Sequence, residues 1–314
     1  MNKIISKEQF SEKVFKLEIE APLIAKSRRA GHFVIVRVDE KGERMPLTIA
    51  GSNLEKGTIT LVVQTVGLSS TKLCKLNEGD YVLDVVGPLG QATHIQNYGT
   101  VVCAGGGVGV APMLPIIQAL KAAGNRVISV LAGRSKDLII LEEEVRASSD
   151  EVIIMTDDGS YGTKGLVTEG IESVIKREKV DKCFAIGPAI MMKFCCLLTK
   201  KYEIPTDVSL NTIMVDGTGM CGACRITVGG KTKFVCVDGP EFDGHQVDFD
   251  EMFKRMGSFK DVEREEMSHL EQHVCKVEPQ AEAKESECKP CSEKACQMPM
   301  EELLDRKAPW REEL

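Results

Sequence analysis

The amino-acid sequence predicts a β + α/β protein. An antiparallel β-barrel is expected over residues 1–95, a parallel α/β sheet over 96–210, a cysteine-containing loop over 211–255 and a charged tail over 256–314. Three observations predict this order. Short alternating strands fill the first part, apolar runs alternate with helical segments in the second, and closely spaced candidate metal ligands follow. With 314 residues the chain is long enough for two domains with hydrophobic cores.

The composition argues against several classes of function. The formal charge is −7, from 40 basic and 47 acidic residues, and no basic tract occurs, so neither nucleic acid nor a membrane is expected as a partner. Residues 1–20 carry scattered charges without an apolar run, so no signal peptide or transmembrane segment is expected. Twelve cysteines without a secretory signal favour reduced thiols and metal ligation in the cytoplasm.

The barrel is expected from strand-length runs that are separated by turn residues such as Lys-Gly, Glu-Gly-Asp and Gly-Pro. These strands are predicted at residues 13–20, 32–38, 58–64 and 81–86.

The parallel sheet is expected from apolar runs that are each followed by a helical segment. The first run enters a glycine loop that contains Gly105, Gly106, Gly107 and Gly109, and a helix is expected to begin near Pro112. Glycines let a backbone approach a pyrophosphate, and a helix N-terminus supplies oriented amides, so the loop predicts a dinucleotide site. The strands are predicted at residues 100–104, 126–131, 151–155 and 182–186.

Two further loops extend this dinucleotide site. Asp157 and Asp158 follow the third apolar run, where an acid can accept a ribose 2′-hydroxyl and repel a 2′-phosphate. They therefore favour NAD(H) over NADP(H), although a solvated turn is the alternative. Gly187 and Pro188 follow the last run and are expected on the nicotinamide side.

Candidate metal ligands follow the sheet. Asp216, Cys221, Cys224 and Cys236 keep the C-x4-C-x2-C…C spacing of plant-type ferredoxins, with aspartate in the first position. Ferric iron accepts a carboxylate, so these four residues are expected to hold a [2Fe–2S] cluster. Glycines within the loop would let its amides point at the sulfurs. A zinc knuckle or a dithiol is the alternative, but zinc usually needs a second CxxC or a histidine pair.

Two segments of the barrel carry a family resemblance. The run Arg44–Met45–Pro46–Leu47–Thr48 looks like the R-x-P-[LI]-[ST] flavin motif of the ferredoxin-reductase superfamily. The run Gly67–Leu68–Ser69–Ser70–Thr71 resembles the phosphate turn of that superfamily. Together with the glycine loop and the cysteine loop, they make residues 1–255 resemble the electron-transfer subunits of dihydroorotate dehydrogenase.

The resemblance implies roles for these residues. Arg44 would lie beside FAD or its phosphates, and the next motif residues would line the isoalloxazine, with Thr48 near N5. No residue stands out as a catalytic acid or base. The isoalloxazine would contact Pro46, Leu47 and Thr48, and the FAD pyrophosphate would contact Gly67, Ser69, Ser70 and Thr71.

Asp216 discriminates between branches of the family, since the pyrimidine branch has four cysteines. A ligand pattern with aspartate in the first position resembles that of the small subunit of NADH-dependent reduced ferredoxin:NADP⁺ oxidoreductase and of the related sulfide dehydrogenase beta subunit. This resemblance implies hydride exchange between NAD(H) and FAD, and single-electron transfer through the cluster. It also implies a larger flavin and iron–sulfur subunit that resembles the glutamate synthase small subunit, with ferredoxin reached through the complex. The alternatives are a subunit of dihydroorotate dehydrogenase or sulfide dehydrogenase, and a stand-alone diaphorase.

The charged tail contains four more cysteines, to which the family gives no role. They could ligate an additional iron–sulfur cluster or a zinc ion, lie against the partner subunit, or lie solvated in a partly ordered segment. They are Cys275, Cys288, Cys291 and Cys296.

Overall fold

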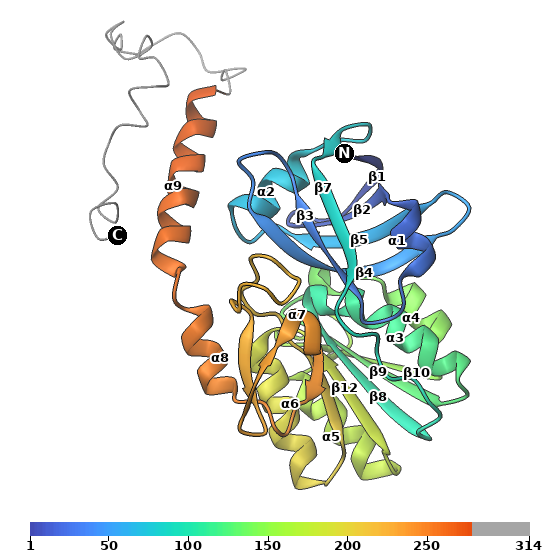
Figure 1. The fold of residues 1–314 in the computed structure, drawn as a ribbon. Coiled ribbons are helices and arrows are strands. Elements are labelled where there is room, and N and C mark those ends of the chain that lie inside the picture. The colour runs from blue at the N-terminus through green and yellow to red at the C-terminus, as the bar shows by residue number, and fades with distance from the viewer. Residues whose placement is uncertain (278–314) are drawn as a thin grey trace, which may run out of the picture. The chain divides into compact units, whose positions relative to one another are not determined.

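The computed structural model describes the backbone of residues 1–277 and the side chains as far as residue 268. Residues Met1–Leu270 form one compact unit (Figure 1). The expected domain boundaries stay a prediction. The side chains of the candidate tail ligands lie outside the described residues; these are Cys275, Cys288, Cys291 and Cys296.

The N-terminal half of the compact unit is an antiparallel sheet with seven strands, in the order β6-β1-β2-β5-β4-β3-β7. Three of the four expected strands form as β2, β3 and β5, and β1 and β4 are additional. The expected strand at 81–86 is divided into β6 and β7 at opposite edges of the sheet, because Val82 pairs with β1 whereas Asp84 pairs with β3. The sheet curls around a core that contains Leu17, Ile49 and Leu61, each fully buried. The strands are β1 (Asn2–Ser11), β2 (Val14–Glu20), β3 (Phe33–Arg37), β4 (Arg44–Asn53), β5 (Thr58–Gln64), β6 (Tyr81–Val82) and β7 (Asp84–Leu89), with helices α1 (Pro22–Ser27) and α2 (Leu68–Lys75).

The second sheet has the strand order β11-β10-β9-β8-β12-β13-β16 and is parallel from β11 to β13. Chain order reverses between β8 and β12, and ligands of open α/β sheets bind outside the carboxyl ends of strands at such a point. The strands are β8 (Thr100–Gly106), β9 (Arg126–Gly133), β10 (Glu151–Thr156), β11 (Thr163–Lys164), β12 (Lys182–Ile186), β13 (Thr206–Ser209) and β16 (Glu241–Asp243).

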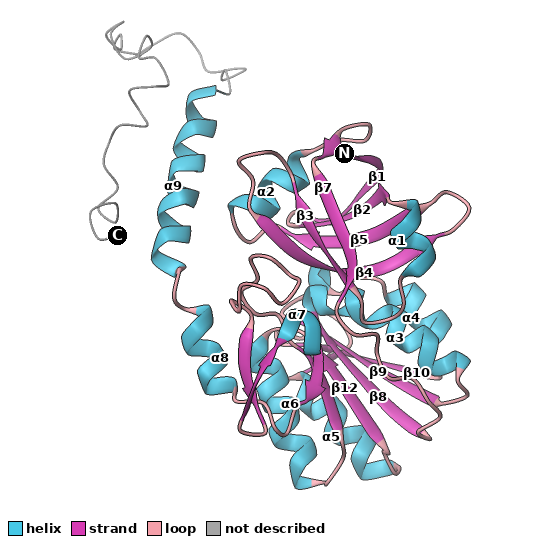
Figure 2. Ribbon diagram, in the orientation of Figure 1, coloured by secondary structure: helices cyan, strands magenta, loops and turns pink. Residues whose placement is uncertain are grey.

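Helices cover both faces of this sheet (Figure 2). The buried side chains of α3 and α4 belong to one hydrophobic cluster, and those of α5 and α6 belong to another. The 3₁₀ turn η1 (Gly107–Gly109) leads into α3, so the expected helix begins two residues before Pro112. The helices are α3 (Val110–Ala122), α4 (Glu142–Ser148), α5 (Val167–Arg177) and α6 (Ala189–Lys201), with a further 3₁₀ turn η2 (Lys136–Leu138).

The cysteine segment packs against both sheets. Its buried Ile226 and Val235 lie in the same hydrophobic cluster as Ile35 of the barrel and Val208 of the parallel sheet. Strand β16 adds antiparallel to β13 and so closes that edge of the sheet. The elements of this segment and those after it are β14 (Arg225–Val228), β15 (Lys231–Phe234), α7 (Val235–Asp238), α8 (Phe249–Met256) and α9 (Lys260–Val277).

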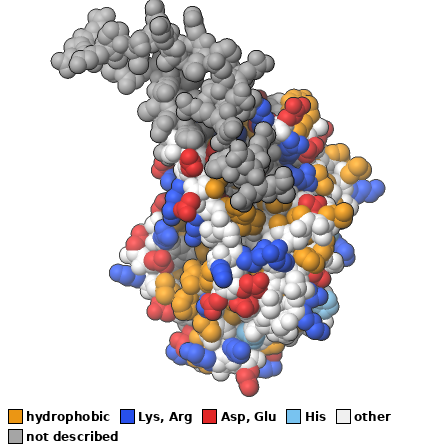
Figure 3. Space-filling view, turned by 60° about the vertical axis from the view of Figure 1, so that its left-hand side comes forward, with side chains coloured by type: hydrophobic (Ala, Val, Ile, Leu, Met, Phe, Trp, Pro, Cys, Tyr) orange, Lys and Arg blue, Asp and Glu red, His pale blue; other side chains and the backbone are white. Residues whose placement is uncertain are grey.

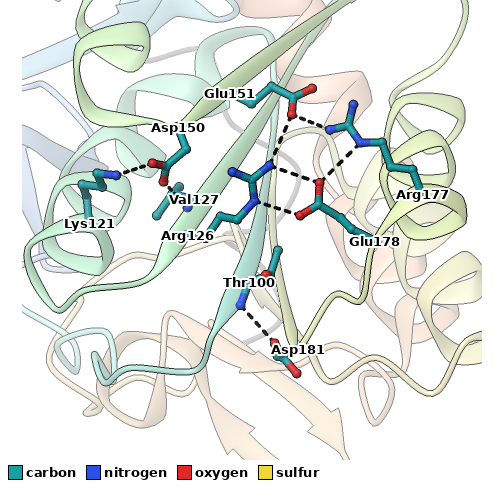
Figure 4. Close-up of polar contacts among 9 residues, drawn as sticks. All are labelled: Thr100, Lys121, Arg126, Val127, Asp150, Glu151, Arg177, Glu178 and Asp181. Atoms are coloured by element: carbon teal, nitrogen blue, oxygen red, sulfur yellow. Dashed lines mark hydrogen bonds and ion pairs between the residues drawn. The ribbon is translucent and has the colours of Figure 1, made fainter.

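Charged side chains fix the amino ends of the parallel strands (Figure 4). Arg126, which begins β9, donates two hydrogen bonds to Glu178, from Nε at 2.8 Å and from Nη2 at 3.2 Å. Arg177 pairs with Glu151 at the start of β10. The Asp181 carboxylate accepts from the Thr100 amide at 3.0 Å. This network lies at the end of the sheet away from the glycine loops, which leaves the carboxyl ends available for ligands.

The surface mixes charges of both signs. On the face drawn in Figure 3, Lys and Arg side chains lie among Asp and Glu and form no extended basic area over the described part of that face. Among the helices that the structure describes, none is long and apolar enough to cross a membrane.

Glu241 lies where the barrel, the linker after it and the cysteine segment meet. Its Oε1 accepts a hydrogen bond from Thr93 Oγ1 at 2.7 Å, and a Cβ on Gly31 would approach Glu241 Oε1 to 3.1 Å. Burial raises the pKa of Glu241 to about 7, and the negative charge of Asp207 acts in the same direction, while the Thr93 hydrogen bond opposes them.

Glu241→Gln should therefore change how stability depends on pH. The folded chain holds the Glu241 proton up to about pH 7, whereas the unfolded chain releases it near pH 4.3. Stability from this group is fully present below the unfolded pKa and is lost as the pH rises through the folded one, by about 4 kcal/mol in total. Glutamine does not ionise, so urea unfolding should show the variant and the wild type similar at pH 4 and the variant more stable at pH 8.

The control is Glu20→Gln, which changes an exposed carboxyl at the end of β2. Its unfolding free energy should follow the wild type at both pH values. Parallel pH profiles for Glu241→Gln and wild type would contradict the assignment of the buried proton to Glu241.

Candidate functional site

The glycine loop and the loop after β12 meet at the reversal of strand order. A Cβ on Gly109 would lie 2.5 Å from Ile186 O and 2.8 Å from Gly187 Cα, and a Cβ on Gly187 would lie 3.2 Å from Gly106 Cα. Glycine at these positions therefore permits close packing of the two loops. Gly105 is also closely packed, but against α3: a Cβ at this position would lie 2.5 Å from Met113 Cε.

Gly107 has a different environment from its neighbours. Its φ is +53°, and a Cβ there would meet no atom within 4 Å. The space that a Cβ would occupy is thus empty at Gly107, whereas at Gly105, Gly106 and Gly109 it is filled by neighbouring atoms. An open, positively charged helix start beside Gly187 and Pro188 fits the approach of a dinucleotide pyrophosphate.

The two aspartates after β10 differ in what they do. Asp158 Oδ1 accepts from the Ser160 amide at 2.8 Å, and hydrogen bonds from Ser160 lower the pKa of Asp158. Asp158 therefore stabilises its own turn, as the solvated-turn alternative describes. Asp157 is exposed, and its amide donates to Gly133 O at 3.1 Å. The Asp157 side chain is the better candidate for the ribose hydroxyl.

The flavin motif forms the first half of β4, paired with β3. Pro46 lies opposite Ile35, and Thr48 lies opposite Phe33. Successive side chains of a strand point to opposite faces. Leu47 packs against the barrel core, so the other face, which carries Arg44, Pro46 and Thr48, is the candidate flavin face.

The predicted phosphate turn begins α2, and its residues do not play equal parts. Ser70 Oγ accepts from the Val66 and Gly67 amides at 3.0 and 3.1 Å and donates to Gly67 O, so it caps its own helix. The Thr71 amide also donates to Gly67 O, at 3.0 Å. A Cβ on Gly67 would meet no atom within 4 Å, so this backbone is open to a ligand.

Ser69 is the serine of this turn that points to an acidic acceptor. Its Oγ donates to Glu43 Oε2 at 2.6 Å. A phosphate oxygen is an acceptor of the same kind, so Ser69 could contact a phosphate only by exchanging Glu43 for it. The sequence reasoning did not single out Glu43, because nothing in its local pattern marks it.

Two of the predicted metal ligands form a buried pair. Cys224 Sγ and Cys236 Sγ lie 3.2 Å apart, and both residues are 2% exposed. The Cys236 amide donates to Cys224 Sγ at 3.5 Å. Burial and the Cys224 thiol raise the pKa of Cys236 to about 12, while the Gly219 amide acts in the opposite direction. Thiols that are paired and faced by amides fit one iron of a cluster.

Asp216 and Cys221 form the outer pair of the set. The Asp216 carboxylate accepts from the Met220 amide at 2.9 Å and from Thr218 Oγ1, and the Thr218 bond is the main cause of its lowered pKa. The Ala223 and Asp216 amides lower the pKa of Cys221, which is exposed. The loop itself thus favours the charged form of both ligands, through the Thr218 hydroxyl at Asp216 and through backbone amides at Cys221.

The loop adopts the tight path expected from its glycines. Gly217, Gly219 and Gly222 all have positive φ, at 80°, 89° and 68°. Within the described residues, no three His, Cys, Asp or Glu side chains converge on a single metal position. Each iron of a two-iron cluster takes two protein ligands, so the inner pair would bind one iron and the outer pair would bind the other.

The loop also contacts the flavin strand. Arg44 Nε donates to Val215 O at 3.1 Å, and Arg44 Nη2 donates to Asp216 O at 3.2 Å. A Cβ on Gly217 would come within 2.6 Å of Ile35, the partner of Pro46 in the sheet. Sequence reasoning placed Arg44 at the flavin and did not anticipate this contact across 172 residues.

Comparison with known proteins agrees with this arrangement. Residues 211–248 match the model of the iron–sulfur cluster binding domain of dihydroorotate dehydrogenase B. A Thermotoga maritima protein, named a homolog of the electron transfer subunit of dihydroorotate dehydrogenase B (NAD(+)), is 50% identical over 264 residues, which are 84% of this chain and 93% of that protein. The chain belongs to this electron-transfer subunit family. The Desulforamulus reducens member is 31% identical over 253 residues, 78% of this chain and 96% of its own.

Within this family, the chain is similar to a solved structure of the NADH-dependent reduced ferredoxin–NADP oxidoreductase, reported for flavin-based electron bifurcation. The identity is 47%, the TM-score is 0.83, and the match covers 86% of this chain and 98% of that one. An Amycolatopsis cytochrome P450 reductase shares the fold at 21% identity and a TM-score of 0.56, over 64% and 65% of the two chains. The expected fold class, a barrel followed by a parallel α/β sheet and an iron–sulfur domain, is confirmed.

Proposed function

We propose that this chain is the NAD(H)-linked electron-transfer subunit of an electron-bifurcating oxidoreductase, and that it binds FAD, a [2Fe–2S] cluster and NAD(H). The observation that carries the proposal is the contact between the flavin strand and the cluster loop. Gly217 packs on Ile35, which pairs with Pro46, so the candidate flavin face and the ligand segment lie beside each other. A relay of electrons requires this proximity.

Each part of the chain has a role in the relay. When bound, NAD(H) supplies a hydride, FAD exchanges either a hydride or single electrons, and the cluster carries one electron at a time. The open backbone at Gly107 orients the dinucleotide, and Pro46 and Thr48 present their face of β4 to the flavin. The buried Cys224 and Cys236 keep water from one side of the cluster site.

The outer ligands determine where electrons leave the chain. Cys221 is exposed and Asp216 is half-buried, whereas the inner pair is buried. We therefore place the acceptor, a larger flavin and iron–sulfur subunit resembling the glutamate synthase small subunit, on the side of the exposed Cys221. Ferredoxin would be reached through that complex. The cytoplasmic location stays a prediction.

The test is anaerobic purification with the partner, followed by assays of flavin, iron and acid-labile sulfide. NADP⁺ reduction by reduced ferredoxin should require NADH. A protein that reduces NADP⁺ equally well without NADH would contradict the bifurcating function. The names of several relatives favour a second candidate, the electron-transfer subunit of dihydroorotate dehydrogenase. Co-purification of a dihydroorotate-oxidising partner, with electrons from dihydroorotate reaching NAD⁺, would identify it.

Asp216→Cys should keep the cluster and change its electronic properties. A thiolate donates more covalently to iron than a carboxylate, so the reduction potential should shift by more than about 59 mV, a tenfold change in a one-electron equilibrium. EPR of the reduced protein and a redox titration measure both effects, and iron content confirms loading. The control is Asp39→Cys in the exposed β3–β4 hairpin of the barrel. Identical spectra for Asp216→Cys and wild type would show that Asp216 is not a ligand.

A further inference from the structure

We propose that Arg44 is a positioning residue for the cluster: its guanidinium, held on the flavin strand, fixes the backbone that carries the ligand Asp216. This inference rests on the proposed function, since it assigns a role toward the cluster. It also goes beyond the role at the flavin that the motif implies for Arg44.

The contact has the geometry of a fork. Arg44 Nε and Nη2 donate to the carbonyls of two consecutive residues, Val215 and Asp216, at 3.1 and 3.2 Å. A planar guanidinium can satisfy two neighbouring acceptors at once, and a charged donor strengthens each hydrogen bond. Two bonds on adjacent carbonyls fix both the position and the direction of this backbone segment.

The ligand segment needs support from outside itself. Val215 is 55% exposed, so packing holds its side chain little. The Asp216 carboxylate bonds within its own loop, to Thr218 and Met220, and these bonds shape the loop without attaching it to the barrel. The Arg44 fork attaches the entry of the loop to β4, directly before the Gly217 contact with Ile35.

The position of Arg44 on β4 makes the connection specific. Arg44 lies on the same strand face as Pro46 and Thr48, and its remaining N–H groups are not used by the loop carbonyls. One side chain thus connects the candidate flavin face with the ligand loop. The flavin motif and the cluster loop behave as one structural unit, although 172 residues separate them.

Arg37 provides a matched control. It pairs with Arg44 directly across the β3–β4 ladder. Its guanidinium also bonds backbone carbonyls, those of Glu40 and Gly42, but these belong to its own hairpin. Arg37→Gln removes the same chemistry from the same strand pair without touching the cluster loop.

The experiment compares Arg44→Gln, Arg44→Lys and Arg37→Gln with wild type in the full chain. Hydrogen exchange of the amides at residues 217–222 reports on the loop, and it can be compared between variants in cluster-free as well as in loaded protein. The rate of iron loss to a chelator and the EPR of the reduced cluster report on the site. FAD content is measured in parallel. The rates of amide exchange and of iron loss are each measured with and without added FAD.

For Arg44→Gln we expect loop exchange and iron loss at least about tenfold faster than wild type, since the loss of either charge-assisted hydrogen bond of the fork alone would have that effect. The EPR signal should broaden, because Asp216 is no longer held in one orientation. Arg44→Lys should resemble Arg44→Gln, since an ammonium keeps the charge but lacks the fork. Arg37→Gln should match wild type.

Three results would overturn the inference. One is loss of FAD by Arg44→Gln with wild-type exchange and iron-loss rates, which would make Arg44 a flavin contact alone. Another is full recovery in Arg44→Lys, which would assign the effect to charge. The third is an equal effect of Arg37→Gln. Wild-type protein that holds neither flavin nor acid-labile sulfide would instead refute the proposed function, and loop exchange would still test the Arg44 contact.

Discussion

Cys224→Ala is expected to remove the iron–sulfur cluster and leave hydride transfer from NADH intact. Cys224 is 2% exposed and lies 3.2 Å from the Cys236 sulfur, so alanine leaves one iron position with a single protein ligand. Iron and acid-labile sulfide per chain should fall by about tenfold or more, as ligand binding energy in metal sites is large. One-electron acceptors should then be reduced poorly, while NADH still bleaches the flavin.

Cys74→Ala is the control for this variant. Cys74 is also buried, at 4% exposed, but it lies in the barrel core. Its removal should lower the melting temperature slightly and leave iron and sulfide at the wild-type level. Full iron content in Cys224→Ala would contradict the ligand assignment, and loss of flavin reduction by NADH would show that the two halves of the relay do not act separately.

Gly109→Ala is expected to weaken NADH binding and lower stability together. The added Cβ would lie 2.5 Å from Ile186 O and 2.8 Å from Ile186 C, and these backbone atoms cannot rotate away. The glycine loop and the loop after β12 must therefore separate. Overpacking of this kind costs about 1–3 kcal/mol. The KM for NADH should rise about tenfold in a dye-reduction assay if a similar free energy is lost from binding.

The matched substitution is Gly257→Ala, after α8. Its φ is −79°, and its nearest neighbour would be the Lys254 carbonyl oxygen at 3.5 Å. Both the KM for NADH and the melting temperature should stay at wild-type values. A normal KM for Gly109→Ala, with a lowered melting temperature, would mean that the glycine serves packing and that the dinucleotide lies elsewhere.

The sequence predicted the four central strands of the second sheet, β8, β9, β10 and β12, and missed its outer strands β11, β13 and β16. Buried parallel strands are continuous apolar runs, and all four expected ones form. Strand β1 is harder to recognise, because charged residues interrupt its alternation and Ile4 is its one fully buried side chain. Strand β4 contains Pro46 and Gly51, residues that usually argue against a strand, and its pairing with β5 shifts register near Gly51. Tertiary pairing outweighs local preference in both strands.

The candidate site was predictable where its signals are local. The spacing from Asp216 to Cys224 specifies a turn, and the structure forms that turn with the glycines in positive φ. The fork of Arg44 on the cluster loop joins distant segments, and no local pattern encodes it. The sequence also does not show which serine of the phosphate turn caps the helix and which is available for another contact. Ser70 caps α2 and Ser69 donates to Glu43, yet both hydroxyls fit the phosphate-turn motif equally well.

Strand β16 has a consequence for how this chain can be divided. It comes from the iron–sulfur segment, yet it hydrogen-bonds to β13 through the pairs Asp207–Asp243, Val208–Phe242 and Ser209–Glu241. A shortened chain that stops before residue 211 would leave the backbone N–H and C=O groups of β13 unpaired along this edge. Unpaired edge strands pair with other chains, and the protein then aggregates. The redox segment therefore doubles as a protective cover, and it cannot be trimmed off like a detachable module.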